Sequence, residues 1–223
     1  MRRKFDLVCF DLDGTLIADD NGLVIWERIL MRIYGNLDVS NQRYKDYKSG
    51  KFSFEEWVNI DLSDWKNNAI TKEVLIEEIK TLKLNPGAKE LVFDLKNEGF
   101  KLAVISGSID FVLEIIFPDH PFEDVFINKI YFDDKGNISH WHASEYGDKG
   151  KADALMLIAK RENIPLEKVA YVGDHANDVS AAKIAGFSFG YNSKSAELDS
   201  IVDVNIKDVD MREIYSYLVE KDD

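Results

Sequence analysis

The stretch FDLVCFDLDGT, residues 5–15, joins an apolar run to two closely spaced carboxylates. Residues 5–10 are rich in Val, Leu and Phe and predict a strand buried on both faces. Asp11 and Asp13 follow directly, two residues apart. A solvated turn needs one Asp at most, and two carboxylates held close together repel each other unless they share a cation. The stretch therefore predicts a first strand that ends in a cation site.

Three further apolar runs predict strands of the same kind, at 102–105, 169–172 and 187–191. Helical patterns separate them, notably GAKELVFDLKNEG (87–99) and KADALMLIAKRENI (151–164). Strands that alternate with helices are typical of a parallel sheet covered on both faces. The predicted fold class is therefore α/β, with a doubly wound parallel-sheet core.

Two segments are too long to be simple connections. Residues 17–84 carry amphipathic patterns, such as LVIWERILMRIYG (23–35), and predict an inserted small all-helical cap domain. The α/β catalytic core then consists of 1–16 and 85–223. Residues 125–142 alternate in strand fashion around a Lys-Gly-Asn turn and predict a small β-hairpin.

Composition narrows the class of protein. The chain has 223 residues and a formal net charge of −13, so we expect no nucleic-acid partner. Its single cysteine, Cys9, permits no internal disulfide and fits a reducing compartment. The first apolar stretch is interrupted by Asp6 and Asp11 and is too short for a signal peptide or a membrane span. We expect a cytoplasmic protein, a monomer or homodimer, with no membrane partner.

The polar residues after the predicted strands indicate a magnesium site. In an open parallel sheet, ligands bind outside the carboxyl ends of the strands, where these loops converge. All of the charged groups there are carboxylates, without a cysteine cluster or a histidine pair, which favours Mg²⁺. Mg²⁺ usually leaves positions for a substrate phosphate, so a small-molecule phosphomonoester is the expected partner. The residues concerned are Asp11, Asp13, Ser106, Gly107, Asp174, Asn177 and Asp178.

Several of these groups can hold a phosphate. Ser106 supplies a hydroxyl, Gly107 allows close backbone approach, and the following helix presents N–H groups to an anion. Ser106 has a second interpretation, in which it merely caps that helix. Lys151 adds a positive charge at the start of another helix, and Lys149 competes with it for this role.

The two acids of the first motif suit covalent catalysis. Asp11, at the strand tip, can be both metal ligand and nucleophile, and attack on phosphorus gives an aspartyl-phosphate. Asp13 points to the same side in extended geometry and can protonate the leaving alcohol, then deprotonate water. Two other interpretations of the Asp13 segment are an ordinary turn and a calcium loop. In the calcium loop Cys9 would fall at the first ligand position, so its register fails.

Four motifs together resemble those of the haloacid dehalogenase (HAD) superfamily, in matching order and spacing. They are DLDGT (11–15), VISGS (104–108), KGKADAL (149–155) and YVGDHANDVS (171–180). The helical insertion after the first motif and the small hairpin after the second resemble the phosphoserine phosphatase branch in particular. The similarity covers nearly the whole chain.

The resemblance implies a role for each motif residue. Asp11 is implied as nucleophile and Asp13 as acid and base. Asp11, Asp174 and the Asp13 carbonyl are implied as Mg²⁺ ligands, with Asp178 also at the metal site, where it steers metal-bound water or Lys151. The residues implied to bind the phosphate or the substrate are Ser106, Gly107, Lys151 and Asn177.

The chain departs from the branch where the substrate's other end is bound. The resemblance implies an acid for the substrate amine, and Asp20 occupies its place. It also implies a cap arginine for the substrate carboxylate, but Asn59 or Asp61 stands there and no Arg occurs from 60 to 100. Because Asp61 would repel a carboxylate, we predict an amine-bearing or neutral phosphomonoester in place of phosphoserine.

The predicted activity is Mg²⁺-dependent hydrolysis of a small phosphomonoester through an aspartyl-phosphate. One alternative is a phosphotransferase or mutase, in which the same intermediate passes its phosphoryl group to an alcohol other than water. Another is a non-catalytic phosphate-binding or signalling module, such as a receiver domain. In a receiver domain, however, the phosphorylated Asp follows an internal strand, and a large cap has no purpose.

Overall fold

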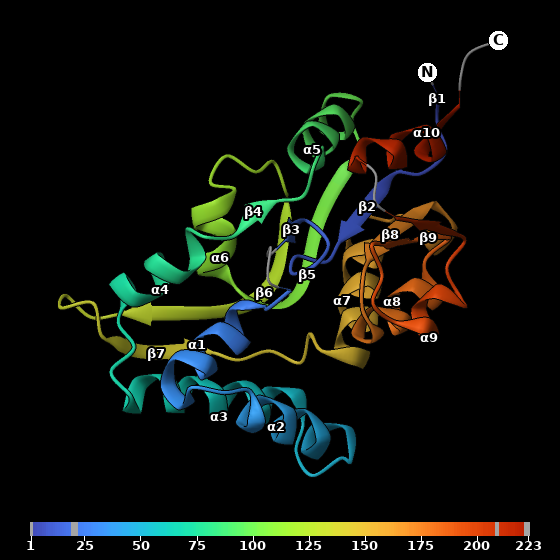
Figure 1. Cartoon of the computed structure of the whole chain (residues 1–223). Helices are drawn as coiled ribbons and strands as arrows, with labels where there is room; N and C mark the ends of the chain where they lie inside the picture. Colours follow the sequence, from blue (N-terminus) through green and yellow to red (C-terminus); the bar gives the residue numbers. More distant parts are fainter. Residues whose placement is uncertain (1, 19–21, 208–209, 221–223) are drawn as a thin grey trace.

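The computed structural model describes residues 2–18, 22–207 and 210–220. Over these residues the centre is a seven-stranded sheet in the order β10-β9-β8-β2-β5-β6-β7 (Figure 1). Neighbouring strands are parallel except for β6 and β7. The strands are β2 (Leu7–Phe10), β5 (Lys101–Ile109), β6 (Asp124–Phe132), β7 (Ile138–His142), β8 (Val169–Gly173), β9 (Phe187–Tyr191) and β10 (Val204–Ile206).

Helices cover both faces of this sheet, as the alternation of strands and helices predicts. Along β2, Val8 and Phe10 join one buried apolar cluster, whereas Leu7 and Cys9 join another on the opposite face. Helices α5 (Ala88–Asn97) and α10 (Tyr215–Leu218) complete the first cluster. Helices α7 (Asp148–Arg161), α8 (Val179–Ile184) and α9 (Ala196–Asp199) complete the second. The doubly wound α/β core is therefore confirmed.

The segment between β2 and α5 is mainly helical in the part that the structure describes, but a short two-stranded sheet at its ends means that it is not all-helical as predicted. It contains α1 (Ile25–Tyr34), α2 (Asp38–Lys48), α3 (Phe54–Asn67) and α4 (Lys72–Ile79). Two short antiparallel strands, β3 (Ile17–Ala18) and β4 (Lys83–Leu84), join its two ends to each other. In Figure 1, α2 and α3 lie below the β6–β7 hairpin, on the far side of it from α5, and α1 overlaps the hairpin in this view.

Helix α3 begins where the sequence contains a capping box. The Ser53 side chain accepts the backbone N–H of Glu56 at 3.1 Å, and the Glu56 carboxylate accepts the N–H of Ser53 at 2.7 Å. This pair fixes the first turn of α3, and with it the position of Trp57 and Asp61 further along the helix.

Two strands differ in extent or role from the sequence-based expectation. β5 continues to Ile109 and includes Ser106, Gly107 and Ser108, with a shift of register against β6 between Ile105 and Ile109. The predicted hairpin is present, but β6 also pairs with β5, so the hairpin extends the main sheet. Helix α6 (Asp110–Ile116) follows β5 directly. The alternation in residues 125–142 predicts two strands, but it does not show with which other strand of the sheet they pair.

The β6–β7 hairpin also contacts the helical segment. The backbone N–H of Lys72 donates to the Gly136 carbonyl at 2.8 Å, and the Trp141 indole N–H donates to the Asn59 side chain at 2.7 Å. Asn59 is therefore occupied by a structural contact. The ends of the described chain meet in β1 (Arg2–Arg3) and β11 (Val219–Glu220), which pair antiparallel. Within the described ranges, no helix is long and apolar enough to cross a bilayer.

Trp65 links the helical segment to the core cluster and gives a test of the packing. It is fully buried and lies 4.9 Å from Trp26 between ring centroids. We expect Trp65→Ala to lower the free energy of unfolding by about 3–5 kcal/mol, measured by chemical denaturation. Leu157→Ala, at a side chain that is 54% exposed on α7, serves as the control. A loss no larger than that of the control would show that the packing of Trp65 is described wrongly.

Candidate active site

A cavity of about 380 Å³ lies between the carboxyl ends of the central strands and helices α1 to α3. Its floor includes Asp11, Asp13 and Asp174, and its opposite wall includes Trp26, Trp57 and Asp61. Ser106, Gly107 and Asn177 also line it. The loops that the sequence predicts to converge therefore do so, whereas Asp20 falls outside the described residues.

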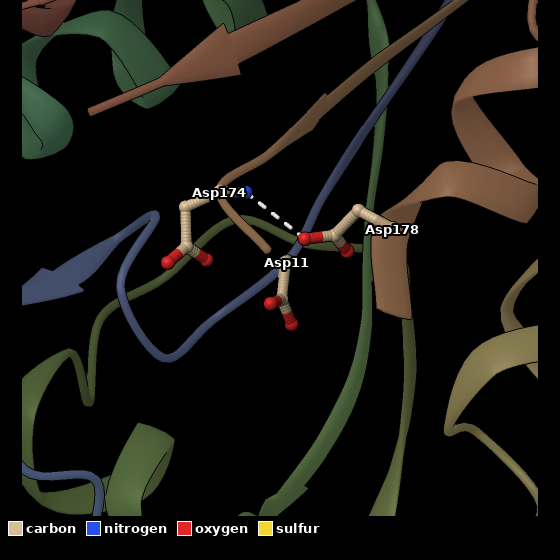
Figure 2. Close-up of side chains that lie close together, drawn as sticks. All are labelled: Asp11, Asp174 and Asp178. Atoms are coloured by element: carbon tan, nitrogen blue, oxygen red, sulfur yellow. Dashed lines mark hydrogen bonds between the residues drawn. The ribbon is translucent and has the colours of Figure 1, made fainter. Parts of the chain in front are cut away.

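Three aspartates meet here: Asp11 and Asp174 line the cavity, and Asp178 is fully buried beside them. Asp11 follows β2, Asp174 follows β8, and Asp178 ends the 3-10 turn Ala176–Asp178. All three are buried, and one oxygen from each lies within 4.8 Å of the others. Figure 2 shows Asp11 from one segment close to Asp174 and Asp178 from another, with the backbone N–H of Asp174 bonded to Asp178 at 2.9 Å. Their oxygens form a donor set that suits a hard divalent cation.

Asp178 is fully engaged by other groups of the protein. One of its oxygens accepts from Lys151 at 2.6 Å and from the Tyr171 hydroxyl at 2.7 Å. The other accepts the backbone N–H groups of Asp174 and His175, both at 2.9 Å. A carboxylate has about four lone-pair positions, and here all are used. Asp178 is therefore suited to holding the floor together, more than to binding a cation directly.

Lys151 lies between two of the acids. Its ammonium is fully buried, 2.9 Å from an oxygen of Asp11 and 2.6 Å from one of Asp178. Burial alone would lower the pKa of Lys151, but the charges of Asp11 and Asp178 raise it above its usual value. Lys149 is exposed, so Lys151 is the lysine that reaches the floor.

The acids of the floor outnumber the positive charges around them. Burial, together with the charge of Asp178, raises the pKa of Asp11 to about 6 despite Lys151. Burial and the charge of Asp11 raise the pKa of Asp13 to about 7. Burial and the charges of Asp178 and Asp11 raise the pKa of Asp174 well above its usual value. This excess of buried negative charge is what a bound Mg²⁺ would neutralise, so the residues present fit the ion.

Two glycines allow the acids to approach so closely. Gly14 has a φ of +85°, and a Cβ there would stand 2.1 Å from an oxygen of Asp174. At Gly173 a Cβ would stand 2.4 Å from the Asp178 carboxyl carbon. The hydroxyl of Thr15 donates to Asp174 at 3.2 Å. The glycine and threonine of Asp-Gly-Thr thus give Asp174 space and a hydrogen-bond donor, and the glycine of Gly-Asp gives Asp178 space.

The predicted phosphate-binding residues lie beside the acids. Ser106 is buried, and its hydroxyl accepts the N–H of Ser108 at 3.2 Å within β5, so it does not cap α6. The Gly107 carbonyl accepts from Asn128 at 2.8 Å, which fixes the backbone of this turn. The side-chain oxygen of Asn177 is buried without a hydrogen-bond partner among the described residues. Asn177 thus lines the cavity with part of its hydrogen-bonding capacity unused.

The helical segment contacts the core around the cavity. The Trp26 indole N–H donates to the Gly107 carbonyl at 3.2 Å, and the Tyr47 hydroxyl donates to Asp148 at 3.1 Å. Phe54 packs so closely on Gly107 and Gly147 that a Cβ on either glycine would clash with its ring. The cavity is therefore covered by these helices.

Two side-chain contacts around the site were not predicted from the sequence. Tyr171 appears there only as a strand residue, yet its hydroxyl donates to Asp178. The one signal in the sequence is that Tyr171 stands two residues before Gly173 of the GDHAND motif. Alternate strand residues share a face, so Tyr171 lies on the same face of β8 as Gly173. Arg43, on α2, pairs with Asp61 and Asp64 on α3, a contact that only the packing of the two helices reveals.

Comparisons with known proteins agree with this geometry. The family model for haloacid dehalogenase-like hydrolases matches residues 8–183. The phosphoserine phosphatase of Methanocaldococcus jannaschii is 31% identical over 218 residues, which cover 98% of this chain and all of that protein.

Two solved structures are similar along almost the whole chain. A substrate-bound phosphoserine phosphatase complex has a TM-score of 0.78 at 29% identity and covers 98% of this chain. A phospho-aspartyl intermediate analogue of phosphoserine phosphatase has a TM-score of 0.77 at 30% identity and covers 97% of it. This chain covers 100% of each of those two chains. The protein belongs to the haloacid dehalogenase-like hydrolases, in their phosphoserine phosphatase-like branch.

Proposed function

We propose that this protein is an Mg²⁺-dependent phosphatase that hydrolyses a small phosphomonoester through a phosphorylated Asp11. Membership of the family and branch makes the chain a phosphatase. The metal, the covalent intermediate, the residue roles and the substrate are the proposed parts. The observation that carries them is the meeting of Asp11 and Asp174 at the floor of a covered cavity. The buried Lys151 lies 2.9 Å from Asp11, and Asp13 is two residues further along the chain.

Asp11 and Asp174, with the backbone carbonyl of Asp13, are the proposed ligands of the ion. Mg²⁺, when bound, would neutralise phosphate charge and make phosphorus a better electrophile. Asp178 instead holds Lys151 and the backbone of the Asp174 loop, because its own acceptor positions are all used.

The chemistry takes two steps at phosphorus. In the first, an oxygen of Asp11 forms a bond to phosphorus as the ester P–O bond breaks, and Asp13 gives its proton to the departing alcohol. In the second, Asp13 takes a proton from water as the water oxygen attacks phosphorus, which frees phosphate and restores Asp11. Lys151, Ser106 and the backbone of Gly107 hold the phosphoryl oxygens, and the side-chain N–H of Asn177 donates to the same group.

The enclosure of the cavity supports a small substrate. Its volume of about 380 Å³ is at the low end of the range for small-molecule sites, and α1 to α3 cover it. We propose that residues 17–84 act as a mobile cap on a core of 1–16 and 85–223, opening for the substrate and closing for the reaction. A cytoplasmic location remains a prediction from the single cysteine.

The role of Asp11 is tested by its removal. We expect Asp11→Asn to lower Mg²⁺-dependent phosphate release from an aryl phosphate by on the order of 10³-fold or more, because the amide cannot form the intermediate. Circular dichroism should show an unchanged fold. Asp134→Asn, an exposed acid of the hairpin turn, is the matched control. Activity of Asp11→Asn within a few-fold of this control would rule out the covalent route.

The same assay separates hydrolysis from transfer to an alcohol. The amount of inorganic phosphate should equal the amount of alcohol released, with or without an added acceptor alcohol. A shortfall of phosphate that grows with the acceptor would identify a phosphotransferase instead.

Binding of the metal has a readout that needs no turnover. We expect Mg²⁺ at 100 times its Kd to stabilise the protein by about 2.7 kcal/mol, seen as a rise in the melting temperature. Asp174→Asn should remove this Mg²⁺-dependent rise, whereas Asp134→Asn should keep it. An equal rise in all three proteins would place the ion elsewhere.

A further inference from the structure

We propose that the wall of the cavity formed by α1 to α3 binds an ammonium group. The substrate is then the phosphate ester of an amino alcohol that carries no carboxylate. This inference rests on the proposed phosphatase function and extends it to the part of the substrate that is not the phosphate.

The charges on this wall exclude a carboxylate as the bound group. Arg43 directs one guanidinium nitrogen to Asp61 at 2.5 Å and another to Asp64. Its two neighbours carry two negative charges against its single positive one, so the cluster has a net charge of −1. No arginine is among the described residues that line the cavity. A substrate carboxylate would therefore meet Asp61 without the bidentate partner that it needs.

Asp61 is the member of this cluster that lines the cavity. Its side chain is only 4% exposed, and Arg43 bonds to one of its oxygens, Oδ1. Burial raises the pKa of Asp61 to about 6 even though Arg43 and the Trp57 side chain both oppose the shift. The buried carboxylate is thus incompletely compensated by the protein. A cation in the cavity would supply the missing charge, whereas a neutral alcohol would not.

Four aromatic rings make the same wall suitable for an ammonium group. Tyr44, Tyr47 and Phe54 surround Trp57, with ring centroids 6.2, 5.4 and 6.2 Å from its own. All four line the cavity, and Tyr44 is 42% exposed although it is a large aromatic residue. Aromatic faces attract cations electrostatically, and such rings with a nearby carboxylate are a means of binding alkylated ammonium groups.

The lysines that line the cavity do not cancel the attraction of this wall for an ammonium group. Lys48 lies 3.4 Å from Asp148, so its charge is already compensated. Lys194 is exposed, and its backbone N–H donates to the Asp174 carbonyl at 2.8 Å, which places it on the phosphate side. Glu27 also lines the cavity, but its charge acts on Asp13 at the floor, so Asp61 is the acid of the opposite wall. The wall opposite the phosphate is therefore acidic and aromatic together.

Matched pairs of substrates test the inference. Phosphocholine is compared with 3,3-dimethylbutyl phosphate, its uncharged analogue of the same shape, and phosphoethanolamine with n-propyl phosphate. Phosphoserine and an aryl phosphate complete the set, all with Mg²⁺. We expect kcat/KM for the better ammonium ester to exceed that of its uncharged partner and of phosphoserine by about 10-fold or more.

Variants of the wall identify the groups responsible. Asp61→Asn removes the charge but keeps the size, and should lower the ratio of kcat/KM between ammonium ester and uncharged partner by about 10-fold. Tyr44→Leu is exposed enough to fold normally and should lower the same ratio by about 3-fold. Tyr217→Leu, at a tyrosine that is 39% exposed on α10, is the control.

The outcomes distinguish the substrate class from the activity itself. Turnover of the aryl phosphate that needs Asp11, combined with equal or better turnover of phosphoserine or of the uncharged esters, would overturn the ammonium site and leave the phosphatase standing. Unchanged ratios in both wall variants would overturn it as well. Failure to hydrolyse any of the compounds would contradict the proposed function, and the substrate class would fall with it.

Discussion

One buried ammonium group, that of Lys151, organises the floor of the cavity. It lies within 3 Å of both Asp11 and Asp178, which come from segments far apart in the sequence. Without it, the buried acids would only repel one another, since burial already raises the pKa of Asp11 and Asp174. Lys151 compensates part of this charge and leaves a remainder that suits a divalent cation. The close spacing of the acids and their ability to hold a metal ion are thus two consequences of one arrangement.

The floor of the cavity and the wall opposite it differ in their charges. At the floor, a partly compensated group of acids suits a cation and, through it, a phosphate. On the wall built by α2 and α3, the guanidinium of Arg43 is already paired with Asp61 and Asp64. The similarity to phosphoserine phosphatases extends over almost the whole chain, but no arginine is among the described residues that line the cavity. Membership of a branch therefore fixes the chemistry at phosphorus more firmly than it fixes the alcohol.

The floor of the site was predictable from the sequence because the carboxyl ends of parallel strands meet at one edge of a sheet. That rule brings DLDGT and GDHAND together without any knowledge of packing. The pairing of Arg43 with Asp61 depends on how two helices pack, which helical periodicity does not specify. Likewise, alternation in residues 125–142 predicts a hairpin, but not that β6 adds to the main sheet. The contact between Tyr171 and Asp178 depends on the pleat of β8 and on the turn after it.

The most direct test is to look for the phosphoryl group on Asp11. Protein turning over an aryl phosphate with Mg²⁺ is quenched in acid, digested and mapped by mass spectrometry. We expect the peptide that contains Asp11 to gain the mass of one phosphoryl group, and the gain to disappear when Mg²⁺ is omitted. Rapid turnover with every peptide unmodified, or with the phosphoryl group on another residue, would contradict Asp11 as the nucleophile.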